Sequence, residues 1–193
     1  MERTLVLIKP DGVQRGLIGE VIGRFERVGL KIIALKLAQA DHDQVDKHYA
    51  LTEGWMKGVY DKAKEKYAEK GEDFPHPDHI SYGTYIKNGL LEYLKSSPVV
   101  AMVLEGEGAV SLVRKLAGAT EPASAAPGTI RGDLTHDTYA LANNGDRPVR
   151  NIIHASGNVD EAENEIGVWF TEAEVHLYDH ANDPVLFDPK RFK

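Results

Sequence analysis

A histidine at the predicted end of a strand is the first residue of this sequence that could carry chemistry. His154 lies in "RNIIHASGN" (150–158), where two isoleucines precede it and small or turn-forming residues follow. Such residues favour the end of a β-strand, so the pattern predicts that His154 lies at the rim of a sheet. The imidazole there could act as a nucleophile near neutral pH, or it could be a structural residue packed beside the isoleucines.

Three widely separated cations point to phosphate binding. Lys9 ends an apolar run, Arg114 lies in an otherwise apolar helix, and Arg131 belongs to the glycine- and proline-containing loop "PGTIRGD". Each could instead extend its charge into solvent from an apolar element. The chain has 23 basic and 30 acidic side chains, so an anion must be held locally. Thr120 could add a hydroxyl and Asn151 an amide.

Other classes of site find less support in the sequence. No segment fits G-x-x-x-x-G-K-[ST], and "GEGAVS" (106–111) matches G-x-G-x-x-G poorly, so a nucleotide would be held by side chains. His76 and His79 could bind a metal, but a polar loop with two prolines explains them more simply. The other histidines show no ligand-like spacing and are predicted to be structural or exposed. The net charge of −7 argues against a nucleic-acid partner.

Apolar periodicity and turn residues predict one α/β domain over residues 1–193 with the order β α β, helical segments, β α β. Two excursions from it are expected, at about 53–91 and 134–149, and the Asn-Gly step of the second predicts a hairpin. Strands are predicted at 4–9, 30–38 and 99–106, with a turn at 9–12, and a last strand is expected to carry Ile152 and Ile153 and to stop where Ala155 begins. Helices are predicted at 18–28, 41–51, 55–70, 84–95, 108–117 and, with Asn158 as N-cap, after 158.

Four stretches that together span most of the chain resemble the nucleoside diphosphate kinase family and occur in the same order as in that family. The Lys-Pro-Asp-Gly turn, the Pro-Gly-Thr-Ile-Arg-Gly loop and the Asn-x-x-His strand end are separate motifs, so the resemblance is specific. The stretches are "TLVLIKPDGVQRGLIGEVIGRFERVGLKIIALKL" (4–37), "SSPVVAMVLEGEGAV" (96–110), "GATEPASAAPGTIRGD" (118–133) and "RNIIHASGNVDEAENEIGVWF" (150–170).

This resemblance implies a ferredoxin-like βαββαβ antiparallel sheet covered by helices, and ping-pong transfer of a γ-phosphate between nucleotides. His154 would be the nucleophile and Glu165 would orient its imidazole, with Ser156 nearby. Lys9 would join them in catalysis. Nucleotide contacts are expected from Lys9, Tyr49, Arg114, Thr120, Arg131 and Asn151.

The resemblance also implies partners. Magnesium would arrive with the nucleotide, so no metal ligands are expected from the protein, and a homo-oligomer, tetramer or hexamer, is expected as in the family. The absence of cysteine suits a reducing compartment, and the apolar run near the N-terminus is too short for a signal peptide or a membrane span, so a cytoplasmic protein without membrane contact is expected. A nucleotide-binding regulatory module without turnover is the alternative.

Two departures from the family pattern stand out. The family more often reads His-Gly-Ser-Asp where this chain reads "HASG" (154–157), so the acidic turn residue is absent. The family's Pro-Phe-Phe segment, whose phenylalanine stacks on the base, is replaced by the 53–91 excursion. Tyr85 or Trp55 of this excursion is therefore predicted to stack on the base, unless both rings only pack the excursion onto the body.

Overall fold

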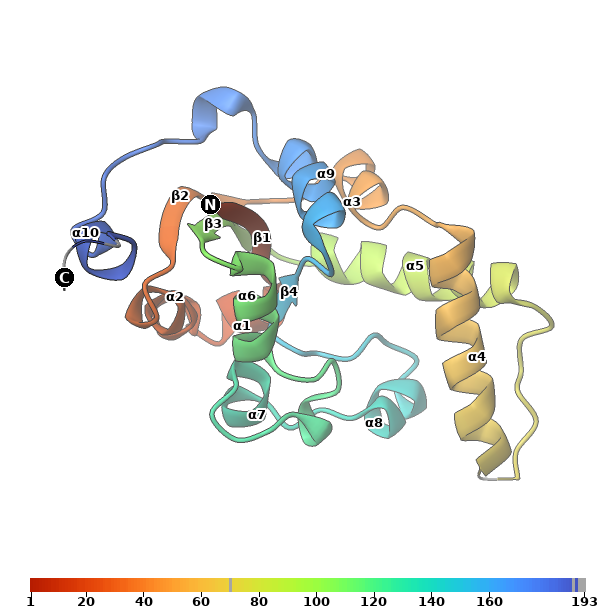
Figure 1. Cartoon of the computed structure of the whole chain (residues 1–193). Helices are drawn as coiled ribbons and strands as arrows, with labels where there is room; N and C mark the ends of the chain where they lie inside the picture. Colours follow the sequence, from red (N-terminus) through yellow and green to blue (C-terminus); the bar gives the residue numbers. More distant parts are fainter. Residues whose placement is uncertain (70, 189, 191–193) are drawn as a thin grey trace.

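A four-stranded antiparallel sheet forms the centre of the molecule (Figure 1). The computed structural model describes residues 1–69, 71–188 and 190. The order β2-β3-β1-β4 places the first and third strands in the middle, as in a ferredoxin-like sheet, and confirms the predicted fold. The strands are β1 (Glu2–Ile8), β2 (Lys31–Ala38), β3 (Val99–Gly106) and β4 (Ile153–Ala155).

The alternation of side chains along β1 builds a core on each face of the sheet. Leu5 and Leu7 belong to one buried cluster, and Val6 and Ile8 belong to the other. A strand buried on both faces must be apolar throughout, which explains its uninterrupted run of apolar residues. Helices α3, α5 and α9 contribute to the Leu5 cluster, whereas α2 and α6 contribute to the Val6 cluster.

The six predicted helices are present with shifted ends, and the structure adds α1, α7, α8 and α10, which the sequence did not predict. No helix among the described residues is long and apolar enough to cross a membrane. The α-helices are α1 (Pro10–Gln14), α2 (Ile18–Arg27), α3 (His42–His48), α4 (Glu53–Glu69), α5 (His79–Lys95), α6 (Ala109–Ala117), α7 (Ile130–Leu134), α8 (Tyr139–Asn144), α9 (Val159–Trp169) and α10 (Asp183–Leu186), with 3-10 turns η1 (Pro122–Ser124) and η2 (Glu172–Glu174).

Three predicted boundaries were wrong for local reasons. The turn expected at 9–12 is the start of α1, which Pro10 can open because its missing N–H is not needed in the first turn. Helix α5 begins at His79, because the Asp78 side chain accepts the Ser81 N–H at 2.8 Å and caps it. The last strand begins only at Ile153, because Ile152 has a φ of 68° that a strand does not allow.

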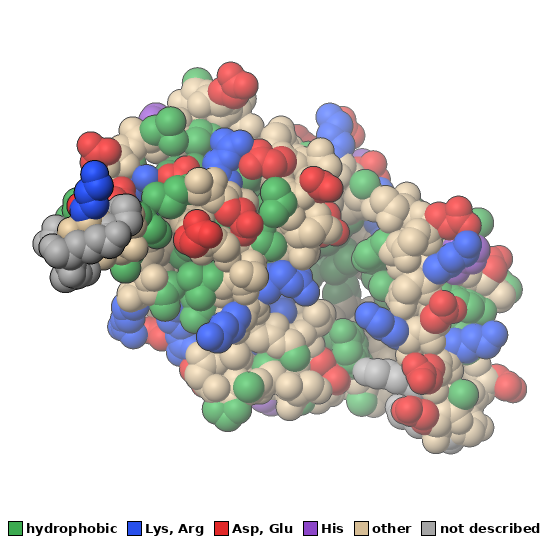
Figure 2. All heavy atoms as spheres, viewed as in Figure 1, with side chains coloured by type: hydrophobic (Ala, Val, Ile, Leu, Met, Phe, Trp, Pro, Cys, Tyr) green, Lys and Arg blue, Asp and Glu red, His purple; other side chains and the backbone are tan. Residues whose placement is uncertain are grey.

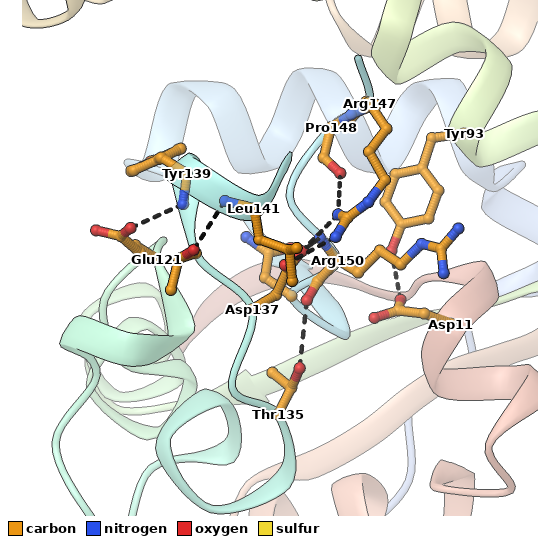
Figure 3. A network of polar contacts seen from close by, with 12 residues as sticks. Asp11, Tyr93, Glu121, Thr135, Asp137, Tyr139, Leu141, Arg147, Pro148 and Arg150 are labelled. Atoms are coloured by element: carbon orange, nitrogen blue, oxygen red, sulfur yellow. Dashed lines mark hydrogen bonds and ion pairs between the residues drawn. The ribbon is translucent and has the colours of Figure 1, made fainter. Parts of the chain in front are cut away.

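The hairpin predicted at 134–149 was also wrong, because this segment contains α8. The Thr138 side chain accepts the Leu141 N–H at 3.0 Å and starts the helix, and Gly145 ends it. Asp137 then closes the segment by accepting hydrogen bonds from the Arg147 guanidinium at 2.6 and 2.9 Å and from the Arg150 N–H at 2.7 Å (Figure 3). The Asn-Gly step therefore serves as a helix end.

The 53–91 excursion is formed by α4, a loop and the first part of α5, which extend away from the sheet (Figure 1). An aromatic cluster joins these pieces, with the Phe74 ring centroid 5.0 to 5.2 Å from those of Tyr60, Tyr67 and Tyr82. His76 lies 4.9 Å from Tyr82 and so belongs to this packing. The surface is hollowed between the body of the molecule and the α4 end (Figure 2).

Candidate active site

The imidazole of His154 is held from one side by a carboxylate. His154 lies in β4, opposite Leu7 of β1, and its Nε2 atom is 3.0 and 2.9 Å from the two oxygens of Glu165 in α9. Nε2 is thereby occupied, and Nδ1 is the nitrogen left to react. Antiparallel pairing with β1 fixes the backbone, so the ring has a defined direction.

Glu165 is itself fixed by a buried hydroxyl. Ser156, which is fully buried, donates its Oγ hydrogen to Glu165 Oε2 at 2.6 Å, and the Leu5 N–H donates to Ser156 Oγ at 3.3 Å. Asn158 caps the helix that carries Glu165 by accepting the Glu161 N–H at 2.9 Å. The sheet edge, the turn and the helix start therefore act together to place one carboxylate.

A chain of polar contacts brings four of the predicted binding residues together. Lys9 Nζ donates to Asn151 Oδ1 at 2.9 Å, and Asn151 Nδ2 donates to the Thr120 carbonyl at 2.8 Å. Arg131 donates to the carbonyl of Asn151 at 3.3 Å and to that of Ile153 at 2.8 Å. These residues, far apart in sequence, border the strand end that presents His154.

The remaining two predicted binding residues lie around this group. Tyr49 follows α3, and its ring is edge-on to that of His154, with centroids 6.2 Å apart and planes at 89°. Arg114 is exposed on α6, and its charge is close enough to lower the pKa values of both Arg131 and His154. The six residues predicted to bind the nucleotide therefore lie near one another or near His154, whereas Tyr85 contacts Asp146, Tyr82 and His76 and is not part of this group.

Burial and like charge make the site electrostatically unusual. Burial, with the Arg131 charge as the next cause, lowers the pKa of Lys9 to about 7, and burial and Arg114 lower the pKa of Arg131 to about 10. Burial and then Lys9 hold the pKa of His154 well below its ordinary value. His154 is therefore a neutral imidazole at pH 7, with its Nε2 proton donated to Glu165 and an electron pair available on Nδ1.

One residue of the site was missed from the sequence. His48, predicted to be structural or exposed, is 6% exposed, and its ring centroid lies 4.4 Å from that of His154. Trp169 Nε1 donates to His48 Nδ1 at 3.3 Å, which fixes the ring. Its position next to Tyr49, which was predicted to be in the site, was the available signal, because the end of one helix presents both side chains.

His48, His154 and Glu165 offer ligand atoms within 4.8 Å of one another, a spacing that a metal ion could use. The hydrogen bonds argue for another use. Nδ1 of His48 accepts the Trp169 N–H, and Nε2 of His154 bonds to Glu165. We therefore assign Glu165 to orienting the reactive ring of His154, against which the His48 ring packs edge-on. His76 and His79 lie in the aromatic loop and at the start of α5.

A neutral imidazole with a free Nδ1, an orienting carboxylate and surrounding cations define a site for phosphoryl transfer through histidine. The family model described as nucleoside diphosphate kinase matches residues 2–71 and 78–175. The chain belongs to the nucleoside diphosphate kinase family, and it is a phosphotransferase that acts on nucleotides.

Relatives that align with this chain over nearly their full length support its membership of this family. A nucleoside diphosphate kinase of Pyrobaculum aerophilum is 46% identical over 91% of this chain and 98% of its own, and one of Archaeoglobus fulgidus is 40% identical over 98% and 100%. The crystal structure of an NDP kinase from Pyrobaculum aerophilum has a TM-score of 0.87 at 44% identity, covering 91% of this chain and 99% of that one. A transition-state mimic of nucleoside-diphosphate kinase from Borrelia burgdorferi, with bound vanadate and ADP, has a TM-score of 0.77 at 38% identity and covers 95% of each chain.

Proposed function

We propose that the chain transfers the γ-phosphate of a nucleoside triphosphate to a nucleoside diphosphate through a phosphohistidine on His154. In the first half-reaction Nδ1 attacks the γ-phosphorus, the bond to the β-γ bridging oxygen breaks, and a nucleoside diphosphate leaves. In the second, the terminal oxygen of another diphosphate attacks the phosphorus and breaks the P–N bond. The observation that carries the proposal is the neutral imidazole whose Nε2 faces Glu165.

The side chains around His154 have separate roles in this proposal. Phosphoryl transfer has a loose transition state, so the protein mainly positions groups and neutralises charge. Lys9, Arg114 and Arg131 supply the positive charge. Hydroxyl and amide contacts to the nucleotide come from Tyr49, Thr120 and Asn151, whereas Glu165 and Ser156 hold the imidazole.

Steady-state kinetics test this proposal against the nucleotide-binding module without turnover. The concentrations of ATP and of a nucleoside diphosphate other than ADP would be varied together. The enzyme hypothesis predicts parallel double-reciprocal lines, because each half-reaction releases a product before the next substrate binds. If the protein binds both nucleotides but forms no new triphosphate, the result would support the alternative hypothesis of a nucleotide-binding module without turnover. The buried orienting carboxylate favours the enzyme, since binding alone does not require it.

The substrates are proposed from the site and from related structures. The Borrelia burgdorferi structure holds ADP, and a halophilic nucleoside diphosphate kinase from Halobacterium salinarum, 36% identical with a TM-score of 0.68, was solved in complex with CDP. We expect this chain to accept nucleotides with either kind of base. Magnesium fits as an ion carried on the phosphates, because Glu165 is bonded to His154 and Ser156, and Asp11 is bonded to Tyr93 and Ile152.

The lowered pKa of Lys9 predicts that nucleoside diphosphate binding weakens as the pH rises above about 7. The free protein then loses a charge that the phosphates favour, so the dissociation constant should rise by up to about tenfold per pH unit. Of the charged groups that face Lys9, Arg131 lowers its pKa and Asp11 raises it, and the Lys9 charge in turn lowers the pKa values of His154 and His48.

Isothermal titration calorimetry at pH 6 to 9 would measure this, with Lys9→Gln as the variant expected to show a flat profile. A dissociation constant of the wild-type protein that stays as constant with pH as that of the variant would contradict this prediction.

The free energy of unfolding should increase with pH, whereas nucleotide binding weakens, because the unfolded chain binds the Lys9 proton up to its ordinary pKa of 10.5. Burial of Lys9 therefore costs folding free energy in full below pH 7, and this cost becomes smaller between pH 7 and pH 10.5, so the free energy of unfolding rises with pH in this window.

We propose further that the 53–91 excursion supplies the platform on which the base stacks. The hollow between the body and the α4 end supports a place for the base (Figure 2). The Tyr85 hydroxyl donates to Asp146 at 2.6 Å, so this tyrosine links the 53–91 segment to the 134–149 segment, and its ring packs beside Tyr82. Trp55 lies half-buried in α4.

Tyr85→Ala or Trp55→Ala should lower kcat/KM by about five-fold to over a hundred-fold, because a stacked base contributes roughly 1 to 3 kcal/mol. Purine and pyrimidine nucleotides should both be affected. Tyr85→Phe keeps the ring and loses only the bond to Asp146, so it is the matched control. Wild-type values for all nucleotides in both alanine variants, folded by circular dichroism, would assign these rings to packing alone.

Residues 1–193 are proposed to form a single domain that carries both excursions. A cytoplasmic homo-oligomer, tetramer or hexamer, remains our proposal from the family resemblance. Sedimentation equilibrium would measure the subunit number directly.

A further inference from the structure

A strained turn separates Asn151 from His154. Ile152 is β-branched and fully buried, and its φ of 68° lies in the region that favours glycine. The Ile153 N–H donates to the Asn151 carbonyl at 2.7 Å, which closes a three-residue γ-turn around Ile152. Such a turn costs free energy and persists only when its surroundings hold it.

The segment that follows β1 provides that support. The Lys9 N–H donates to the Ile152 carbonyl at 2.7 Å, and Asp11 Oδ2 accepts the Ile152 N–H at 3.1 Å. At Gly12, an added Cβ would lie 3.0 Å from Ile152 Cγ2 and 2.8 Å from Ile8 Cγ2, so glycine permits the close approach. Both polar backbone groups of the strained residue are therefore bound by one short stretch of chain.

The carboxylate of Asp11 is held in turn by α5. Asp11 is 8% exposed, and its second oxygen accepts a hydrogen bond from the Tyr93 hydroxyl (Figure 3). Lys9 Nζ lies 5.7 Å from the centroid of the Tyr93 ring. The Asp11 charge also opposes the lowering of the Lys9 pKa. One buried carboxylate thus joins α1, α5 and the turn before the reactive strand.

We infer that Asp11, held by Tyr93, is a positioning residue for phosphoryl transfer, because it fixes the turn that sets Asn151 and His154 relative to each other. The inference rests on the proposed role of His154. Arg131 donates to the carbonyls on both sides of Ile152, those of Asn151 and Ile153, so a displaced turn would also displace the guanidinium that we propose binds the phosphates. Asp11 acts through the turn and does not need to touch the nucleotide.

Single-turnover phosphorylation of His154 by ATP, with nucleotide affinity measured separately, tests the inference. Asp11→Ser, whose hydroxyl is too short to reach Ile152, should slow phosphorylation by about ten- to a hundred-fold and change ADP affinity by less than threefold. Asp11→Asn keeps an oxygen for the Ile152 N–H and should restore the rate to within about threefold. Tyr93→Phe should slow it by about three- to tenfold.

Asp183→Ala is the matched control, because Asp183 also accepts a backbone N–H through its carboxylate, that of His180 at 3.0 Å, but in α10 and outside every segment proposed to bind the nucleotide. It should lower the melting temperature without slowing phosphorylation. A wild-type rate in Asp11→Ser, or in Tyr93→Phe if the serine variant does not fold, would overturn the inference. An Asp11→Asn variant as slow as Asp11→Ser would also overturn it, since the hydrogen bond would then not be what matters. Failure of the wild-type protein to label at His154 would instead refute the proposed function.

Discussion

His154→Ala is expected to abolish turnover, lowering kcat by on the order of 10⁶, the scale seen when a covalent nucleophile is removed. In our proposal the imidazole forms the bond to phosphorus, and the neighbouring groups only hold it and neutralise charge. Glu165 and Ser156 remain in place but have no ring to orient. A coupled assay of ATP formation from ADP and a second triphosphate would measure the loss.

The control for this variant is an exposed histidine elsewhere in the fold. His136→Ala should keep wild-type turnover, because His136 is exposed in the loop before α8. Nucleotide binding should survive in His154→Ala, since the three cations are unchanged. Substantial turnover in a folded His154→Ala variant would contradict the assignment of the nucleophile.

Alanine substitution of any one of Lys9, Arg114 and Arg131 should lower kcat by on the order of 10² or more. Removing one preorganised electrostatic contact from an enclosed site typically has this effect. Steady-state kinetics of the three variants would measure it. Effects below about threefold in all three would show that these cations are not part of the reaction.

The three variants should differ in whether they lower stability as well as turnover. Arg131 also donates to the carbonyls of Gly118, Asn151 and Ile153, so Arg131→Ala should lose stability as well as turnover. Arg114 is exposed and no hydrogen bond of its side chain is seen among the described residues, so its effect should be on turnover alone. Lys115→Ala, at the neighbouring exposed position, is the matched control.

The regular part of the fold was predictable because its signals are local. A run of apolar residues predicts β1, amphipathic spacing predicts α2, and the Asn158 cap predicts the start of α9, each from residues close together in the sequence. The 134–149 segment was mispredicted because an Asn-Gly step fits both a hairpin and a helix end. The bonds from Arg147 and the Arg150 N–H to Asp137, which distinguish the two, join residues ten or more positions apart.

The site was predictable as far as its residues belong to motifs. His154, Lys9 and Arg131 each stand in a stretch with a recognisable pattern. His48 and Asp11 were missed because their roles depend on what the fold places beside them. The ring of His48 packs edge-on against that of His154, and Asp11 accepts a hydrogen bond from Ile152, which is 141 positions away. Asp11 belongs to the Lys-Pro-Asp-Gly motif and His48 precedes Tyr49, but neither position in the sequence reveals the distant partner.

The most direct test of the central claim is to incubate the protein with γ-labelled ATP alone. We predict a covalent phosphoenzyme with about one label per chain, labile to acid and stable to base, and lost in His154→Ala but not in His136→Ala. A peptide map should place the label on the segment that contains His154. Absence of any label in the intact protein, or labelling unchanged in His154→Ala, would contradict it.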